Sequence, residues 1–134
     1  MANEITIVGR LLFNTANSAS LSTTYKEDYN PPSIQADLAS LIASSGVKNI
    51  IHTDQEALPL GEVNAGGGWA FFRNVGATYD VKIGVSVGDA ISGDFYPFVQ
   101  LKPGEYTCLR LANHNVIAQP VTGATDLQYH IQMA

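Results

Sequence analysis

The chain has 134 residues, of which 46% are hydrophobic and 14% charged, and its formal net charge is −5. This length suits one domain that buries a core without metal or disulfide cross-links, and the charged fraction lies below the roughly 25% typical of soluble domains. The basic residues are scattered from Arg10 to Arg110 and form no stripe for neutralising phosphates, so we expect no nucleic-acid binding. No apolar run approaches the ~20 residues that span a bilayer, so we expect no membrane partner.

The first 29 residues predict extended structure. Residues 4–13 alternate as in a strand, until Gly9 breaks the register. Residues 18–29 are dominated by Ser, Thr and Tyr, which predicts a polar edge strand or an extended arm. The N-terminus also lacks the positive and apolar regions of a secretory signal, so we expect the product to be made in a cytoplasm.

The next segment is ambiguous between helix and strand. Over 34–44, helical spacing fits Ile34, Leu38, Leu41 and Ile42. Strand alternation also fits Ile34, Ala36 and Leu38. We favour extended or irregular structure because Ser and Pro flank the segment. Residues 47–53 predict a further strand.

The C-terminal half predicts short strands separated by turn residues. The clearest signal is the alternation of apolar residues from Tyr79 to Val87. In the last strand Leu127, Tyr129 and Ile131 face the core, and His130 faces away with its neighbouring glutamines. The predicted strands of this half are 69–74, 79–87, 95–101, 105–111, 115–120 and 126–133.

Two prolines mark particular positions. Pro97 lies inside a predicted strand, which favours an edge or irregular place because proline cannot donate to a ladder. Lys102-Pro103-Gly104-Glu105 predicts a type II turn, with proline at the second position and glycine supplying a positive φ at the third.

About eight short strands without βαβ rhythm predict an all-β fold, a β-sandwich of the jelly-roll or immunoglobulin-like kind. We expect a single domain over 1–134, with 18–45 as an extended arm or interaction segment. Tyr25 and Tyr29 in that segment are the candidate interaction residues, because rigid aromatic anchors dominate interface energetics.

No residue pattern predicts an enzyme, a cofactor or a metal. His52, His114 and His130 lack further ligands at metal spacing. Asp89 and Asp94 bracket a glycine-containing loop without the dense oxygen ligands of a calcium site. The triple glycine at 66–68 precedes a strand rather than a helix, so a phosphate cradle is disfavoured. Cys108 lies in a strand pattern and is expected to be a packed structural thiol.

The aromatic residues leave one binding alternative open. Trp69, Tyr79 and Tyr96 could stack sugar rings if they lay together on one surface, as in a carbohydrate-binding module. The structural alternative is that these side chains pack in the core. We favour the core for Trp69 because it begins the most apolar strand.

From about Leu58 to the C-terminus the sequence resembles small structural proteins encoded beside the capsid and tail genes of tailed bacteriophages. The segments that carry the resemblance are Leu58–Gly61, Gly68–Asn74, Tyr79–Gly84, Phe95–Phe98, Leu101–Glu105, Leu109–Leu111 and Leu127–Ile131.

The resemblance implies a non-enzymatic accessory protein of the virion, made in the host cytoplasm. Such a protein would be a capsid decoration (cement) protein or a component of the neck, tail or head fibre. Its partners would be the major capsid protein or other virion proteins. Sheet edges in so small a protein also call for neighbours, so we expect a homo-oligomer, in particular a trimer.

Overall fold

The computed structural model describes residues 5–8, 11–14, 26–29, 34–36, 43–51, 55–59, 68–89, 92–112 and 116–133. The regular secondary structure of these residues consists of β-strands alone. The chain divides into two compact units, residues 1–38 and 39–134. The sequence predicted one domain with an arm over 18–45. Residues from Ala43 onward form strands of the second unit. The expectation of a single domain with an extended arm or interaction segment over 18–45 stays a prediction.

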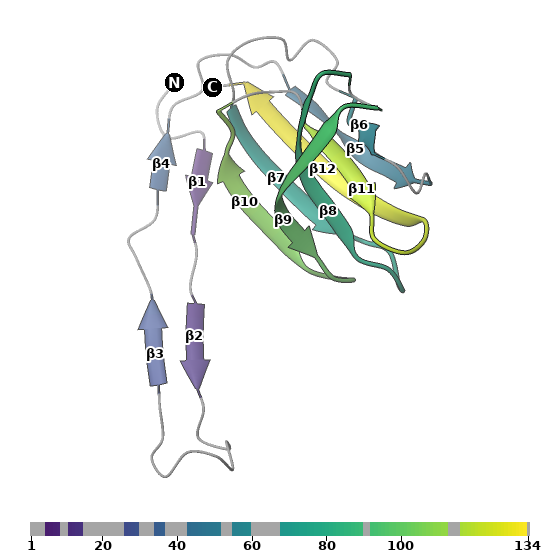
Figure 1. Ribbon diagram of the computed structural model, residues 1–134. Helices are drawn as coiled ribbons and strands as arrows, with labels where there is room; N and C mark the ends of the chain where they lie inside the picture. The colour runs from purple at the N-terminus through teal and green to yellow at the C-terminus, as the bar shows by residue number, and fades with distance from the viewer. Residues whose placement is uncertain are drawn as a thin grey trace. The chain divides into compact units, whose positions relative to one another are not determined.

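The first unit is an antiparallel hairpin (Figure 1). Strand β1 (Ile5–Ile7) pairs with β4 (Ile34–Ala36), and β2 (Leu11–Asn14) pairs with β3 (Lys26–Tyr29). β1 and β2 form the outgoing branch and β3 and β4 the returning one. The predicted strand over 4–13 is therefore two strands, and the extended prediction for 34–44 is confirmed where that segment is described, at β4 and the start of β5.

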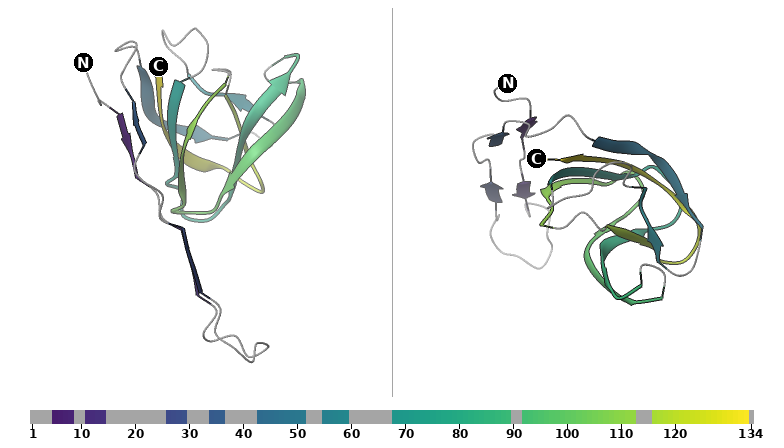
Figure 2. Two further views of the ribbon diagram at one scale, coloured as in Figure 1. Left: turned by 90° about the vertical axis from the view of Figure 1, so that its left-hand side faces the viewer. Right: turned by 90° about the horizontal axis from the view of Figure 1, so that it is seen from above.

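The second unit contains two four-stranded antiparallel sheets, in the orders β10-β7-β12-β5 and β6-β11-β8-β9 (Figure 1). The two sheets lie on opposite sides of a shared interior (Figure 2). The strands are β5 (Ala43–Ile50), β6 (Glu56–Ala57), β7 (Gly68–Asn74), β8 (Val81–Val87), β9 (Asp94–Leu101), β10 (Tyr106–Arg110), β11 (Ile117–Pro120) and β12 (Thr125–Met133).

The pairing pattern identifies the topology of the sandwich. The first strand of the unit pairs with the last, the second with the seventh, the third with the sixth and the fourth with the fifth: β5 with β12, β6 with β11, β7 with β10, and β8 with β9. This nested pairing is one long hairpin rolled over so that successive strand pairs fall in alternate sheets. The predicted all-β sandwich is confirmed, and of the two topologies considered the strand order is that of a jelly roll.

Strand alternation builds the core. On β7, Gly68, Ala70, Phe72 and Asn74 are buried, while the residues between them are half-buried or exposed. The last strand behaves as predicted, because Leu127, Tyr129 and Ile131 point inward. The apolar residues that both sheets contribute to one cluster are Ile50, Leu58, Ala70, Phe72, Val81, Ile83, Leu101, Leu111, Val116, Ala118, Leu127, Tyr129 and Ile131.

A single buried asparagine connects four parts of the sandwich. The Asn74 side chain, at the end of β7, is 0% exposed. Its Nδ2 donates to the carbonyl oxygens of Tyr79 (2.8 Å) and Leu101 (3.0 Å), and its Oδ1 accepts from Thr125 Oγ1 (2.8 Å) and Gly76 N (3.1 Å). These four bonds use the full capacity of an amide, so the buried polar group is fully compensated.

The predicted type II turn is confirmed. Glu105 N donates to Lys102 O at 3.0 Å, and Gly104 has φ of 85°. Gly104 N also donates to Asn74 O (2.8 Å), and Asn74 N donates to Glu105 O (2.9 Å). The turn is thereby fixed to the end of β7.

Pro97 lies on an edge strand, as its sequence position predicted. β9 is the last strand of its sheet, and its register against β8 shifts between Ile83 and Gly84. A Cβ atom at Gly84 would lie 2.1 Å from Tyr96 O, so this close approach of two backbones requires glycine.

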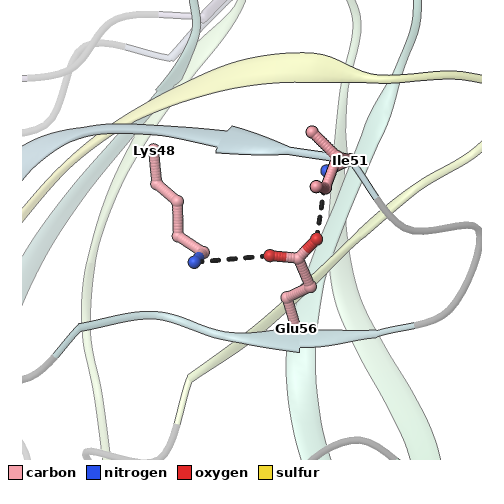
Figure 3. Close-up of polar contacts among 3 residues, drawn as sticks. All are labelled: Lys48, Ile51 and Glu56. Carbon is pink, nitrogen blue, oxygen red and sulfur yellow. Dashed lines mark hydrogen bonds and ion pairs between the residues drawn. The ribbon is translucent and has the colours of Figure 1, made fainter.

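Polar contacts link the neighbouring edges of the two sheets (Figure 3). Glu56 on β6 accepts a hydrogen bond from Ile51 N at 3.0 Å and forms an ion pair of 3.3 Å with Lys48 on β5. Ser44 Oγ on β5 donates to Pro59 O. β5 begins at Ala43, earlier than the predicted strand over 47–53, and ends at Ile50.

Candidate functional site: the outer face of one sheet

The two tyrosines singled out from the sequence belong to the N-terminal unit. Tyr29 is the last residue of β3 and pairs with Leu11 of β2. Tyr25 lies outside the described residues. Their proposed role as interaction anchors stays a prediction.

The sheet β10-β7-β12-β5 presents a second candidate surface. Because successive strand residues point to opposite sides, every residue between two core residues of this sheet points away from the sandwich. We call these residues the outer face. By strand they are Tyr106, Cys108 and Arg110; Trp69, Phe71 and Arg73; Asp126, Gln128, His130 and Gln132; and Ala43, Ser45, Val47 and Asn49.

Three aromatic side chains lie on neighbouring strands of the outer face. The rings of Phe71 and Tyr106 are stacked, with centroids 6.1 Å apart and an interplanar angle of 30°. The Arg110 guanidinium lies over the Trp69 ring at 5.6 Å from its centroid, within the range of a cation–π contact. The tyrosine is 68% exposed, so this aromatic group is accessible from outside.

Trp69 does not belong to the core, and that prediction was wrong. It is half-buried on the outer side of β7, while Ala70 and Phe72 take the inward positions. Its indole N–H is covered yet finds no acceptor. An uncompensated donor of this kind costs about 1–3 kcal/mol.

The outer face is basic although the chain is acidic. It holds Arg73, Arg110 and His130 and one carboxylate, Asp126, which accepts a hydrogen bond of 2.7 Å from Asn49 Nδ2 at the end of the face. The prediction that His130 faces away from the core is confirmed.

The outer face is hollowed between β5, β7 and β12. A depression of about 380 Å³ is lined by Val47, Phe71, Gln128 and His130 among other residues. Val47 at its rim is 61% exposed. The depression therefore offers apolar side chains together with amide and imidazole groups.

Cys108 lies in the middle of β10, at one edge of this face, opposite Phe71 on the neighbouring strand. The sequence predicted a packed thiol, but the residue is exposed. Partial burial by the surrounding side chains nevertheless raises the pKa of the thiol above its ordinary value. Because the thiolate is the nucleophile, this shift lowers the reactivity of the side chain.

The described part of the chain does not bring together the residues of the metal and calcium sites that were considered from the sequence. No three His, Cys, Asp or Glu residues come together there in a group that could hold a metal ion. Asp89, considered for calcium, accepts from Ser92 N through Oδ1 (3.1 Å) and from Gly93 N through its carbonyl (2.8 Å), so it closes its own loop. His52, His114, Gly66 and Gly67 lie outside the described residues. Among the described residues no helix is long and apolar enough to cross a membrane.

The three aromatic residues considered for glycan stacking do not share a surface. Trp69 lies on the outer face of one sheet, Tyr96 lies on β9 of the other sheet, and Tyr79 lies in the connection between β7 and β8. The aromatic group that the fold does assemble consists of Trp69, Phe71 and Tyr106. The sequence signal for it was the charge at Arg73, which marks the alternating positions 69, 71 and 73 as outward.

Comparisons of the chain with protein-family models, with curated proteins and with solved structures gave no match.

Proposed function

We propose that this chain is a non-enzymatic structural protein of a tailed-phage virion, and specifically a capsid decoration protein that stabilises the head. Support comes from the sequence resemblance over residues 58–131 and from the jelly-roll topology, a fold used by viral capsid domains. Fold alone assigns no function, because jelly rolls serve many roles. The argument therefore depends on which surfaces the chain offers to partners.

The observation that carries the proposal is the N-terminal hairpin. Its described strands pair two by two, β1 with β4 and β2 with β3. A two-stranded hairpin is marginally stable in water at best. Contacts with a neighbour would add to this pairing, so the hairpin suits attachment to the surface of a larger particle.

The outer face supports the same proposal. Trp, Tyr and Arg are the residue types that contribute most to binding energy at protein interfaces, and Trp69, Tyr106 and Arg110 lie together there. The proposed partners are the major capsid protein and further copies of this chain, as trimers at three-fold positions, once the protein leaves the host cytoplasm for the virion. No cofactor enters the proposal.

The test is reconstitution on phage heads. Heads assembled without this chain, from the phage whose genome encodes it, are mixed with the purified protein and sedimented. We expect saturable binding and a higher temperature of DNA release from the decorated heads. Binding only to tails or necks would support the alternative of a neck, tail or head-fibre component, and absence of the chain from purified virions would refute a virion role.

A further inference from the structure

The two sheets of the sandwich end in four edge strands, β5, β6, β9 and β10. β6 has two residues and β10 has five. β5 is tied to the segment that follows it by the contacts of Lys48 and Ile51 with Glu56. β9 is eight residues long, and among the described strands only β8 pairs with it (Figure 1). β9 is therefore the longest edge of the sandwich without such contacts.

This open edge is apolar. Residues 95–101 carry no charge, and the charges nearest to them along the chain are Asp94 and Lys102. Tyr96 is 55% and Phe98 46% exposed, and a depression of about 240 Å³ is lined by Phe98 and its neighbours. Charged side chains are one of the devices that keep an edge strand from pairing with another chain. The middle of β9 lacks this protection, so we expect it to be covered by a partner.

Pro97 limits how the edge can be covered. A proline in an edge strand offers no N–H and opposes open-ended stacking of strands. A two-fold contact, in which β9 of one copy pairs antiparallel with β9 of a second copy, is closed, because each edge then covers the other. The edge therefore suits one further copy and not a growing series of copies.

The charges at the two ends of β9 select the register of such a pair. If the two-fold axis passes between the Phe98 residues of the two copies, Asp94 of each copy lies opposite Lys102 of the other. Opposite charges on directly opposed residues stabilise a strand pair. Neither side chain forms a hydrogen bond or an ion pair with another described residue, so both are available to the second copy. In this register Tyr96 lies opposite Gln100.

We propose that this protein forms a two-fold dimer through β9. The contact joins the sheet β6-β11-β8-β9 of one copy to the same sheet of the second copy. Tyr96 and Phe98 of both copies form one cluster across the axis, and the ion pairs of Asp94 with Lys102 close its two ends. The contact does not depend on a role in the virion. In a particle it would join copies that belong to neighbouring trimers.

A cysteine at the two-fold axis tests both the occupant and the register. Opposed residues of an antiparallel pair have Cα atoms about 4.5–5.5 Å apart, within the range of a disulfide. Phe98→Cys is introduced into the full chain together with Cys108→Ser, which removes the native thiol. Gln100→Cys in the same background is the matched control, because Gln100 is an exposed residue of the same strand. In the proposed register it lies four residues, or about 13 Å, from Gln100 of the second copy.

Each variant is oxidised with copper phenanthroline and run on a non-reducing gel. We expect a covalent dimer from Phe98→Cys, and also from Tyr96→Cys combined with Gln100→Cys, which keeps Phe98. Gln100→Cys alone should give few cross-links. Absence of a dimer from the first two variants would overturn the proposal. Equal cross-linking of the control would overturn it too, because random collision would then explain the dimer.

Charge reversal gives a second test with the same readout. Lys102→Glu added to the Phe98→Cys chain should lower the yield of covalent dimer at least roughly fivefold, because Asp94 then faces a like charge at both ends. Adding Asp94→Lys should restore the yield, and Arg73→Glu, in the other sheet, should leave it unchanged. No rescue, or an equal loss from Arg73→Glu, would refute the proposal. A chain that passes both tests but does not bind heads would refute the virion assignment alone.

Discussion

Replacing Asn74 with leucine should remove a large share of the stability of the sandwich. Leucine has a similar volume but no polar atoms, so the carbonyls of Tyr79 and Leu101, the Gly76 N–H and the Thr125 hydroxyl all lose a partner. A buried polar group left unsatisfied costs about 1–3 kcal/mol. Water can reach some of these groups after relaxation, so we expect a total loss of about 3–5 kcal/mol.

That loss is a substantial part of the ~5–15 kcal/mol that stabilises a typical domain. For a unit of this size, about 1 kcal/mol corresponds to roughly 4–8 °C in Tm, so the midpoint should fall by more than about 12 °C. Urea titration and calorimetry of wild type and variant measure both quantities. An unchanged m-value would indicate that the loss lies in stability and not in the compactness of either state.

Asn49→Leu is the matched control. Asn49 also donates an amide hydrogen bond, to Asp126 at 2.7 Å, but it is exposed, so water replaces the lost partner. Its loss should stay below about 1 kcal/mol. Thr125→Val should cost about 1 kcal/mol in the wild type and less in the Asn74 variant, because the two side chains share a bond. If the Asn74 and Asn49 variants melted together, the role of the buried asparagine would be refuted.

Three further predictions concern the turn, the hairpin and the thiol. Gly104→Val should cost about 1–3 kcal/mol in calorimetry because φ is 85°; no atom crowds the site, so Gly104→Asn should be milder, and two variants melting with the wild type would contradict this. Tyr25→Ala with Tyr29→Ala should weaken attachment to heads and leave the Tm of the sandwich nearly unchanged, since both residues belong to the first unit; a large fall in Tm would place them in a core. Cys108 should react with iodoacetamide more slowly than a cysteine peptide at pH 7.5, and gain rate as pH rises toward its raised pKa; faster labelling than the peptide would argue against the shift.

Local sequence signals located most strands of the sandwich. The strand predicted over 79–87 was found at Val81–Val87, and the strand predicted over 126–133 at Thr125–Met133, because alternation with period two is imposed by burial of one face. The turn at 102–105 was predictable for a different reason. Proline and glycine restrict backbone angles regardless of what surrounds them.

Features that depend on distant partners were not predictable. β6 has two residues, Glu56 and Ala57, too few for any period, and it exists because β11 pairs with it. β5 starts within the Ser-rich stretch before Val47, where only pairing with β12 determines strand structure. Neither partner lies within the sequence windows that reveal a local pattern.

The sequence located strand β7 but not the candidate site, because the site depends on which of the two alternating sets of β7 residues faces the core. In Gly68–Asn74 both alternations contain aromatic residues, so hydrophobicity could not say whether Trp69 and Phe71 or Ala70 and Phe72 face inward. The set that faces inward is the one that ends in Asn74, whose buried amide makes hydrogen bonds to three other segments. Arg73 falls in the opposite set, which placed Trp69 and Phe71 with it on the outside.

The same choice connects the core to the proposed interface. A polar hub at Asn74 fixes the register of β7 against the turn at 102–105 and the start of β12, and β7 is the strand that carries Trp69, Phe71 and Arg73 outward. The outer face is therefore held by a buried amide that makes four hydrogen bonds. A rigid face binds at a lower entropic cost than a mobile one, so the stability of the hub and the affinity of the face for a partner should be coupled. A mild hub variant such as Thr125→Val should consequently weaken self-association as well as stability; unchanged association in sedimentation would show that the face does not depend on the hub.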